Sequence, residues 1–356
     1  REINGVLYYL MQAKIEPGNV NNVQISPTLQ ATESNFTRVH KGKTPLYLEY
    51  FLDRKKSIIL FDNLQSEQGS RFLRKRNRNI IIQVFDEIPV DENFRWITLN
   101  QIKELMKLDN TINMDTRTVI SHIPIMKLKT LSFTSIQNDY SSGNNHNSIN
   151  SIDEVNARLI DLKFKYKINI RKKKLNNLTD WIFNKNEIFK NDESYFKVIF
   201  ANIEIQNREV SGWNQPLIKS CFEGLYGFIV KLINGKYHFL IQLVLECGNS
   251  DGFELGPTVQ CLDFNYCESK TPFLNYFMSC IQENVIYDTL QSEEGGRFYH
   301  DQNRNMIIKV NETEINELPE NYIWMTYEQI LLFIKFNNYV NIQARSLIAS
   351  LINLEF

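Results

Sequence analysis

The stretch LQSEQGSRF at residues 64–72 returns as LQSEEGGRF at residues 290–298. An Asn-Arg-Asn tripeptide follows each stretch at the same distance, and a β-branched apolar run comes after it. Matches continue upstream at one constant offset, from Gln12 with Gln242 to Asn35 with Asn265. Four further pairs lie downstream: Trp96 with Trp324, Gln101 with Gln329, Asn113 with Asn341 and Arg117 with Arg345. Similarity over this length indicates a duplicated domain rather than the short units of a solenoid.

The length of 356 residues fits two domains, each able to bury its own core. We expect a first copy at residues 1–136, a linker rich in Ser and Asn at 137–153, and a second copy at 154–356. The second copy has a lead-in that runs from about Leu175 through Trp213 to Val230, and no counterpart of it precedes Arg1. We therefore expect the chain to begin inside the first copy.

Composition and charge exclude several classes of protein. A hydrophobic share of 43% is typical of a folded soluble protein, and no apolar run reaches the roughly 18 residues that a membrane helix needs. Forty basic and 41 acidic residues give a net charge of -1, which offers no general attraction for nucleic acid or anionic lipid. We therefore expect neither of these as a partner, and any anion site must be local.

The cysteines and the start of the chain bear on the compartment. All five cysteines lie in the second half, without the close pairs typical of zinc sites: Cys221, Cys247, Cys261, Cys267 and Cys280. This pattern favours reduced thiols in a cytoplasm. No secretion leader is visible at the start of the sequence.

Local patterns predict mixed α+β domains with mostly antiparallel sheet and few helices. Asn-Gly signals introduce expected strands at residues 6–14 and 237–245, and short apolar runs predict strands at 57–61 and 285–287. We interpret each Asn-Arg-Asn tripeptide as the turn of a second hairpin, and Gly18-Asn19 and Gly248-Asn249 as turns. Residues 98–108 and 326–336 have the spacing of amphipathic helices, with Thr98 and Thr326 as N-caps.

Several longer motifs resemble those of the NDP-hexose 2,3-dehydratase family. They are LMQAKIEPGN at residues 10–19, SPTLQAT at 26–32, LQSEQG at 64–69, WNQP at 213–216 and GPTVQC at 256–261. The resemblance implies a homodimer of subunits with two tandem Nudix-like domains, one in each copy. It also implies a lyase that acts on a nucleotide-linked 4-keto-6-deoxyhexose, expected to be dTDP-linked, with no metal and no cofactor. Consistently, the sequence lacks the Nudix box whose glutamates hold Mg²⁺.

Removal of water across C2–C3 of such a sugar sets definite chemical demands. The C4 ketone acidifies the C3 proton, so an enolate can form and expel the C2 hydroxyl. The protein must supply a base near C3, a donor for the developing oxygen charge and an acid for the leaving group. It must also bind a diphosphate, for which guanidinium groups or backbone N–H groups are suited.

The repeated segment offers a carboxylate and a guanidinium close together. Glu67 and Glu293 are the carboxylate candidates for catalysis. Four arginines are candidates for the diphosphate or the ketone, namely Arg71, Arg78, Arg297 and Arg304. The alternative is that a Glu and an Arg at this spacing pair across a hairpin and support the fold.

Other candidates each have a structural alternative. His40 can serve as base or acid, or it is a solvated loop residue. Tyr50 and Tyr299 can donate a proton or pack in the sheet. Gln30 and Gln260 can bond the sugar or the backbone. Trp213 and Gln215 can contact the ligand or belong to a core strand. The sequence leaves open which copy is active, and it leaves a non-catalytic sugar-nucleotide binding module as the alternative function.

Overall fold

The computed structural model describes residues 1–37, 39, 43–123, 147–205, 211–262 and 271–351. Strands outnumber helices, and the sheets are antiparallel or mixed, which confirms the expected α+β class. The first copy contains β1 (Glu2–Ile3), β2 (Val6–Lys14), β3 (Gln24–Pro27), α1 (Glu33–Phe36), α2 (Leu48–Leu52), β4 (Ile58–Ser66), β5 (Arg76–Gln83), β6 (Phe94–Thr98), α3 (Leu99–Leu105) and α4 (Met114–Ile120).

Helix α6 (Ile152–Lys165), whose N-cap is Ser151, spans the expected start of the second copy. The last residues of the expected linker are therefore helical, while residues 137–146 lie outside the described residues. The remaining elements are η2 (Leu175–Asn177), β7 (Trp181–Phe183), β8 (Glu187–Lys190), β9 (Phe196–Glu204), β10 (Gly212–Ser220), β11 (Gly224–Ile233), β12 (Lys236–Leu245), β13 (Phe253–Gly256), β14 (Val259–Cys261), α8 (Leu274–Met278), η3 (Gln282–Asn284), β15 (Val285–Ser292), β16 (Gln302–Val310), β17 (Tyr322–Thr326), α9 (Tyr327–Ile334) and α10 (Ile342–Ser350).

The repeated sequences form repeated structures. Strand β2 pairs with β3 and β6, as β12 pairs with β13 and β17. The hairpin β4–β5 corresponds to β15–β16. Helices α3 and α9 both begin after a threonine N-cap, Thr98 and Thr326, each in a capping box with a glutamine. The strands expected at residues 6–14 and 237–245 and the two helix starts are confirmed.

The Asn-Arg-Asn tripeptides are not turns, contrary to our interpretation. Residues 77–79 and 303–305 lie inside β5 and β16, and the chain reverses before them, between residues 66 and 76 and between 292 and 302. Alternation along a strand sends Arg78 outward and Asn79 inward, where Asn79 donates to Thr118 at 2.8 Å. The sequence pattern was misleading because asparagine is common in turns but also satisfies buried polar contacts.

The two copies differ at one position of the sheet. In the second copy β11 lies between β12 and β16, antiparallel to the first and parallel to the second. In the first copy β1 corresponds to the last residues of β11, and in the described chain no strand joins β2 to β5. The first copy therefore has an open space where the second has a continuous sheet.

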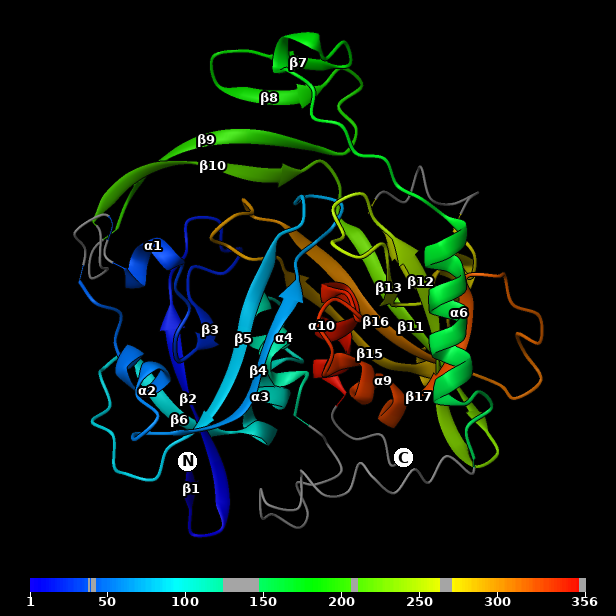
Figure 1. The fold of residues 1–356 in the computed structure, drawn as a ribbon, viewed down its shortest axis with the longest axis horizontal. Helices are drawn as coiled ribbons and strands as arrows, with labels where there is room; N and C mark the ends of the chain where they lie inside the picture. The colour runs from blue at the N-terminus through cyan, green and yellow to red at the C-terminus, as the bar shows by residue number, and fades with distance from the viewer. Residues whose placement is uncertain (38, 40–42, 124–146, 206–210, 263–270, 352–356) are drawn as a thin grey trace.

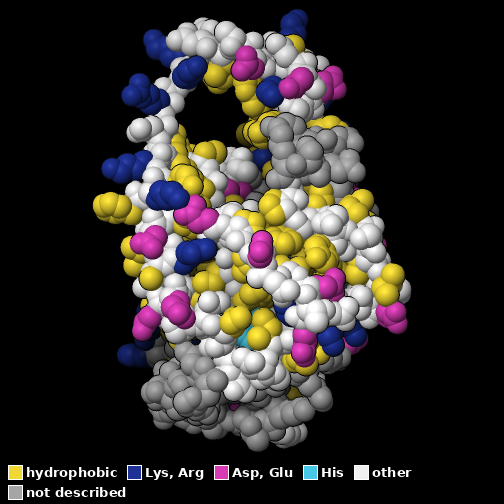
Figure 2. Space-filling view, turned by 90° about the vertical axis from the view of Figure 1, so that its right-hand side faces the viewer, with side chains coloured by type: hydrophobic (Ala, Val, Ile, Leu, Met, Phe, Trp, Pro, Cys, Tyr) yellow, Lys and Arg dark blue, Asp and Glu magenta, His cyan; other side chains and the backbone are white. Residues whose placement is uncertain are grey.

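Strands β7–β10 form a separate sheet that extends from the top of the molecule (Figure 1). Its long hairpin β9–β10 passes over the first copy. Figure 2 shows an opening below this extension, with hydrophobic side chains along its edge. Apolar side chains are exposed on the extension and on the segment that leads to it: Tyr166, Ile168, Ile170, Ile182, Phe183, Tyr195 and Phe200.

Two buried arginines connect the copies at the centre, where α4 and α10 pack against each other (Figure 1). Arg117 donates to the Ser292 carbonyl at 2.6 Å, and Arg345 donates to the Ser66 carbonyl at 2.6 Å. Burial lowers the pKa of each guanidinium to about 10. Each copy thus uses a helix to hold the end of the other copy's hairpin strand.

The two Gly-Asn segments make a second reciprocal contact. The Gly18 N–H donates to the Gly295 carbonyl at 2.8 Å, and the Gly248 N–H donates to the Gly69 carbonyl at 2.7 Å. A Cβ at Gly18 would lie 1.6 Å from the Phe298 carbonyl oxygen. Only glycine permits this approach, so the segments are turns whose backbone meets the loop of the opposite copy.

Two simpler findings complete the description. Cys221, Cys247 and Cys280 are free thiols, and Cys267 lies outside the described residues. Within the described ranges, no helix is long and apolar enough to cross a membrane.

Gly18→Ala is expected to lower the free energy of unfolding by at least about 2 kcal/mol, because the new methyl overlaps backbone of the opposite copy. Gly212→Ala is the control, since its Cβ would meet nothing closer than 3.6 Å, and its effect should stay within about 0.5 kcal/mol. Urea unfolding measures both. Equal effects of the two substitutions would contradict the close contact between copies.

Candidate active site

A cavity of about 1080 Å³ lies in the first copy and is closed at one end by residues of the second. Its apolar part lies between β2 and β5, with Leu10 and Ile82 among its lining, and corresponds to the place that β11 fills in the second copy. Its polar part is built from both copies and from β10. This polar part is the candidate site, because it brings together the titratable groups of the cavity.

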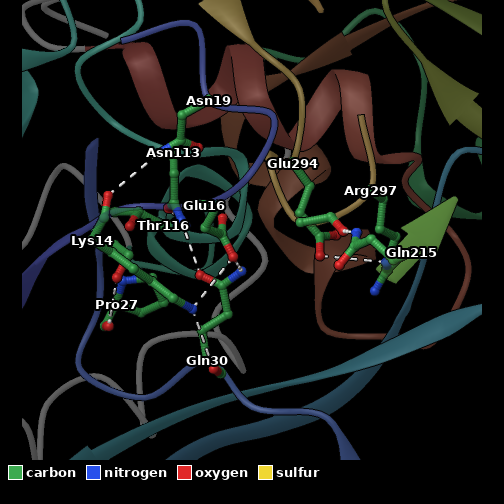
Figure 3. Close-up of polar contacts among 12 residues, drawn as sticks. Lys14, Glu16, Asn19, Pro27, Gln30, Asn113, Thr116, Gln215, Glu294 and Arg297 are labelled. Atoms are coloured by element: carbon green, nitrogen blue, oxygen red, sulfur yellow. Dashed lines mark hydrogen bonds and ion pairs between the residues drawn. The ribbon is translucent and has the colours of Figure 1, made fainter. Parts of the chain in front are cut away.

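The first copy contributes a hydrogen-bonded series of side chains (Figure 3). Asn113, the N-cap of α4, donates to Gln30 Oε1 at 3.0 Å. Gln30 Nε2 donates to Glu16 Oε1 at 3.1 Å. The Lys14 ammonium lies 3.4 Å from the same Glu16 oxygen. Strand β2 and its following turn thus hold Lys14 and Glu16 against the segment before α1 and the start of α4.

The second copy contributes Glu294, Gly296 and Arg297 (Figure 3). Arg297 Nε lies 3.4 Å from Glu294 Oε1, and Arg297 Nη1 lies 3.2 Å from Glu67 Oε2. A Cβ at Gly296 would lie 3.3 Å from Glu16 Oε1 and 3.4 Å from Glu294 Oε1, so the two carboxyl groups flank this glycine. The loop after β15 therefore meets the end of β2 across the cavity.

Strand β10 closes a further side of the site. Gln215 Nε2 donates to the Gly296 carbonyl at 2.8 Å, and Trp213 Nε1 donates to Gln215 Oε1 at 2.6 Å. Both side chains line the cavity. The expected lead-in of the second copy thus reaches the pocket of the first.

Four carboxyl groups face two cations here: Glu16, Glu67, Asp115 and Glu294 against Lys14 and Arg297. Burial, and then the charges of Glu16 and Glu67, raise the pKa of Asp115 to about 7. Burial, and then Asp115, hold the pKa of Glu294 well above its usual range. Neighbouring carboxyl groups cannot all ionise in a partly dry site, so the site retains protons near neutral pH.

Four buried polar atoms of cavity-lining residues lack a hydrogen-bond partner among the described residues: Tyr9 Oη, Glu16 Oε2, Asp115 Oδ2 and Arg297 Nη1. Of these, Arg297 Nη1 lies 3.2 Å from Glu67 Oε2. Glu16 is only 7% exposed. Buried polar atoms are normally bonded, so these atoms are placed to meet the polar groups of a ligand.

The equivalent place in the second copy has different chemistry. Glu246 corresponds to Glu16, but Gln260 Nε2 donates to its Oε1 at 2.7 Å and the Gly69 N–H donates to its Oε2 at 2.9 Å. Around it, four positions lose a charge or gain a side chain: Val244 for Lys14, Gln343 for Asp115, Gln68 for Glu294 and Ser70 for Gly296. Both oxygens of Glu246 are therefore occupied by the protein, whereas Glu16 keeps one for a ligand.

The two carboxylates predicted from the sequence, Glu67 and Glu293, are buried and do not line the cavity. Glu67 is 7% exposed, accepts a hydrogen bond from Asn77 and pairs with Arg297, without lining the cavity. Glu293 accepts from Gln68 at 2.5 Å and Asn303 at 2.8 Å. Burial, and then Asp301, raise the pKa of Glu293 to about 8.

The predicted arginines fall into two groups. Arg78 and Arg304 are exposed and pair across their hairpins with Asp62 and Asp288, both at 2.6 Å. Their pKa values are raised by these hydrogen bonds. Arg297 enters the site, and Arg71 occupies the corresponding place beside the second copy, where its guanidinium lies 4.8 Å from the Phe196 ring centre.

The remaining predicted residues are placed as follows. Gln30, Trp213 and Gln215 line the cavity, whereas Gln260 bonds Glu246. Tyr50 lines the apolar part and packs near Tyr47. Tyr299 stands outside the cavity, with its ring 4.5 Å from that of His300. His40 lies outside the described residues.

Sequence reasoning missed Lys14, Glu16, Asp115 and Glu294 as site residues. A signal was present, because Glu16 matches Glu246 while the other three change to an uncharged residue in the opposite copy. What the sequence did not reveal is that the loop of one copy faces the strand of the other. Among the described residues, no group of three or more His, Cys, Asp or Glu side chains is arranged to hold a metal ion.

Comparison with known proteins identifies the family of this chain. A family model described as NDP-hexose 2,3-dehydratase matches residues 1–123 and 153–351. The chain belongs to the NDP-hexose 2,3-dehydratase family. The match covers both copies and omits most of the segment between them, and it confirms the resemblance found in the motifs.

Three relatives of this dehydratase family share the name dTDP-4-dehydro-6-deoxy-alpha-D-glucopyranose 2,3-dehydratase. The protein of Saccharopolyspora spinosa is 41% identical over 99% of this chain and 75% of its own length. That of Streptomyces violaceoruber is 38% identical over 97% of this chain and 77% of its own. That of Amycolatopsis orientalis is 37% identical over 98% of this chain and 71% of its own.

Glu293→Gln is expected to make stability depend less on pH. The unfolded chain loses this proton near the ordinary glutamate pKa, whereas the folded protein keeps it up to about 8, so stability falls as pH rises through this window. The glutamine variant lacks this loss. Its melting temperature should fall less than that of the wild type between about pH 5 and about pH 8.

The control for this measurement is Glu312→Gln, which changes an exposed glutamate on a loop. Its melting curve should follow the wild type over the same pH range. A Glu293→Gln variant that also follows the wild type would show that Glu293 does not carry the buried proton.

Proposed function

We propose that the polar part of the cavity removes water across C2–C3 of a nucleotide-linked 4-keto-6-deoxyhexose, with dTDP as the nucleotide. One observation supports this most strongly: Glu16 lines the cavity and has a buried carboxyl oxygen without a hydrogen-bond partner in the described chain, while both oxygens of its counterpart Glu246 are bonded within the protein. The first copy is thus the one with a base available to a substrate.

In this proposal Glu16 removes the C3 proton that the C4 ketone acidifies. The Lys14 ammonium, held 3.4 Å from Glu16, meets the charge that develops on the C4 oxygen. Arg297 Nη1 supplies a further donor, and Glu67 orients that guanidinium from behind. The enolate then expels the C2 hydroxyl, so one proton and one hydroxide leave as water.

The diphosphate belongs at the opposite side of the pocket from the carboxyl groups, which would repel it. Lys75, Arg76 and Arg78 line the cavity on strand β5 and the residue before it, and they are exposed. The second copy has Asp301 and Gln302 in place of the first two. The second copy thus keeps one of these three cations, Arg304 in place of Arg78, so the pocket that we assign to catalysis has the more cationic edge. Trp213 and Gln215 are then positioned for the nucleotide or sugar.

The remaining expectations are part of the same proposal. We assign residues 1–136 and 154–356 to two tandem Nudix-like domains, which the matching strand pairings of the two copies support. We assign a homodimer, for which the exposed apolar side chains of the β7–β10 extension offer a surface. The free thiols fit a cytoplasmic enzyme.

Glu16→Gln is expected to lower kcat by a factor on the order of 10² to 10⁴, because an amide cannot take the C3 proton. Glu246→Gln is the matched control and should keep kcat within about threefold, since Glu246 lies outside the cavity and bonds Gln260 and the Gly69 N–H. The assay follows the loss of one water from dTDP-4-keto-6-deoxyglucose by mass spectrometry and NMR.

The same variants separate catalysis from binding alone. Titration of dTDP should show that Glu16→Gln still binds the nucleotide while it forms no product. A wild-type protein that binds the sugar nucleotide and never releases water would favour the non-catalytic binding module. Equal loss of activity in Glu16→Gln and Glu246→Gln would remove the argument from the asymmetry of the pockets.

Arg76→Gln is expected to raise KM about tenfold with little change in kcat, because it removes one charge-assisted contact to the diphosphate. Arg171→Gln, which changes an exposed arginine in the segment after α6, is the control and should leave both constants unchanged. Initial rates over a range of substrate concentrations measure both. A lower kcat at unchanged KM would place the diphosphate elsewhere.

A further inference from the structure

Asp115 occupies the second position of α4, directly after the residues that shape the pocket. The Asn113 side chain accepts the Thr116 N–H at 2.9 Å and so fixes the first turn of the helix. This turn directs Asp115 to the cavity wall, and its Oδ2 is buried without a hydrogen-bond partner in the described chain. The charged groups that act on it are Glu16, Glu67, Lys14 and Arg297, and Glu294 also interacts with it.

Asp115 differs from the other carboxyl groups of the cluster in its partners. Glu16 lies within ion-pair distance of Lys14, and Glu67 and Glu294 lie within that distance of Arg297. No such cation is found for Asp115 among the described residues. Burial and the two neighbouring glutamates raise its pKa to about 7, so Asp115 retains a proton near neutral pH without a cation beside it.

The opposite copy supplies a natural comparison. Gln343 stands in the equivalent place on α10, and neither of its side-chain polar atoms has a partner in the described residues. Gln343 is fully buried, so the position leaves a buried polar atom without a partner in both copies, but only the first copy places an acid there. The difference accompanies the change from a sequestered Glu246 to an available Glu16.

We propose that Asp115 is the catalytic acid that protonates the C2 hydroxyl as it leaves. This assignment rests on the proposed function of Glu16 as the base. Glu16 takes the C3 proton, and the electrons of the C3–H bond enter the enolate. As the C2–C3 double bond forms, the electron pair of the C2–O bond moves to oxygen, which takes the Asp115 proton and departs as water. Glu16 is then protonated and Asp115 ionised, and proton exchange with solvent restores both.

The test uses Asp115→Asn with two substrates. With dTDP-4-keto-6-deoxyglucose in D₂O, water loss should fall by a factor on the order of 10² to 10⁴, while exchange of the C3 proton continues. With the analogue that carries fluorine at C2, fluoride release should stay within about tenfold of the wild type, because fluoride leaves with little help from an acid. Asp115→Glu should restore part of the water loss.

The controls separate this proposal from the proposed function. Glu16→Gln should lose both C3 exchange and fluoride release, and if it keeps them, the base assignment fails. If Glu16→Gln behaves as expected but Asp115→Asn slows fluoride release as much as water loss, or slows neither, Asp115 is not the acid. Gln343→Leu should leave all rates unchanged. If Asp115→Asn does not fold, Asp115→Ser is measured in its place by the same criteria.

Discussion

The structure depends on a reciprocal contact in which each copy of the duplicated domain holds the hairpin loop of the other. Arg117 and Arg345 reach across from α4 and α10 to backbone carbonyls at the ends of β15 and β4. Gly18 and Gly248 bring the backbone of each copy against the loop that follows β15 or β4 in the other copy. Loss of a partner would leave a buried guanidinium unpaired, so the contact is costly to break. The polar part of the cavity exists only because this contact is made.

The reciprocal contact also explains how two nearly equivalent pockets can differ. Each pocket has a glutamate after its first long strand and an arginine from the opposite loop: Glu16 with Arg297, and Glu246 near Arg71. A few substitutions then separate them. Where the first has Lys14, Asp115 and Glu294, the second has Val244, Gln343 and Gln68. The first pocket thereby keeps charged and protonated side chains that a ligand can contact. In the second, the amide groups of Gln260 and Gly69 already bond Glu246.

Much of the fold was predictable from the sequence because it depends on local patterns. Asn-Gly signals before runs of β-branched and aromatic residues located β2 and β12, and Thr98 and Thr326 located two helix starts. The Asn-Arg-Asn turns were predicted wrongly because asparagine was assigned its most common role.

The site was predictable only in part. Arg297, Gln30, Trp213 and Gln215 were identified as candidates, but Glu16 and Asp115 become partners only when β2, α4 and the loop of the other copy meet in space.

The Gly18 and Gly248 contacts have a consequence for how such a chain can arise. A single ancestral copy would lack the facing loop and hold no complete pocket. Two identical copies related by a twofold axis would complete two identical pockets, each built from both partners. Once both copies share one polypeptide, their sequences are free to change separately. One pocket can then specialise in proton transfer while the other keeps the interface intact, which two identical subunits could not achieve.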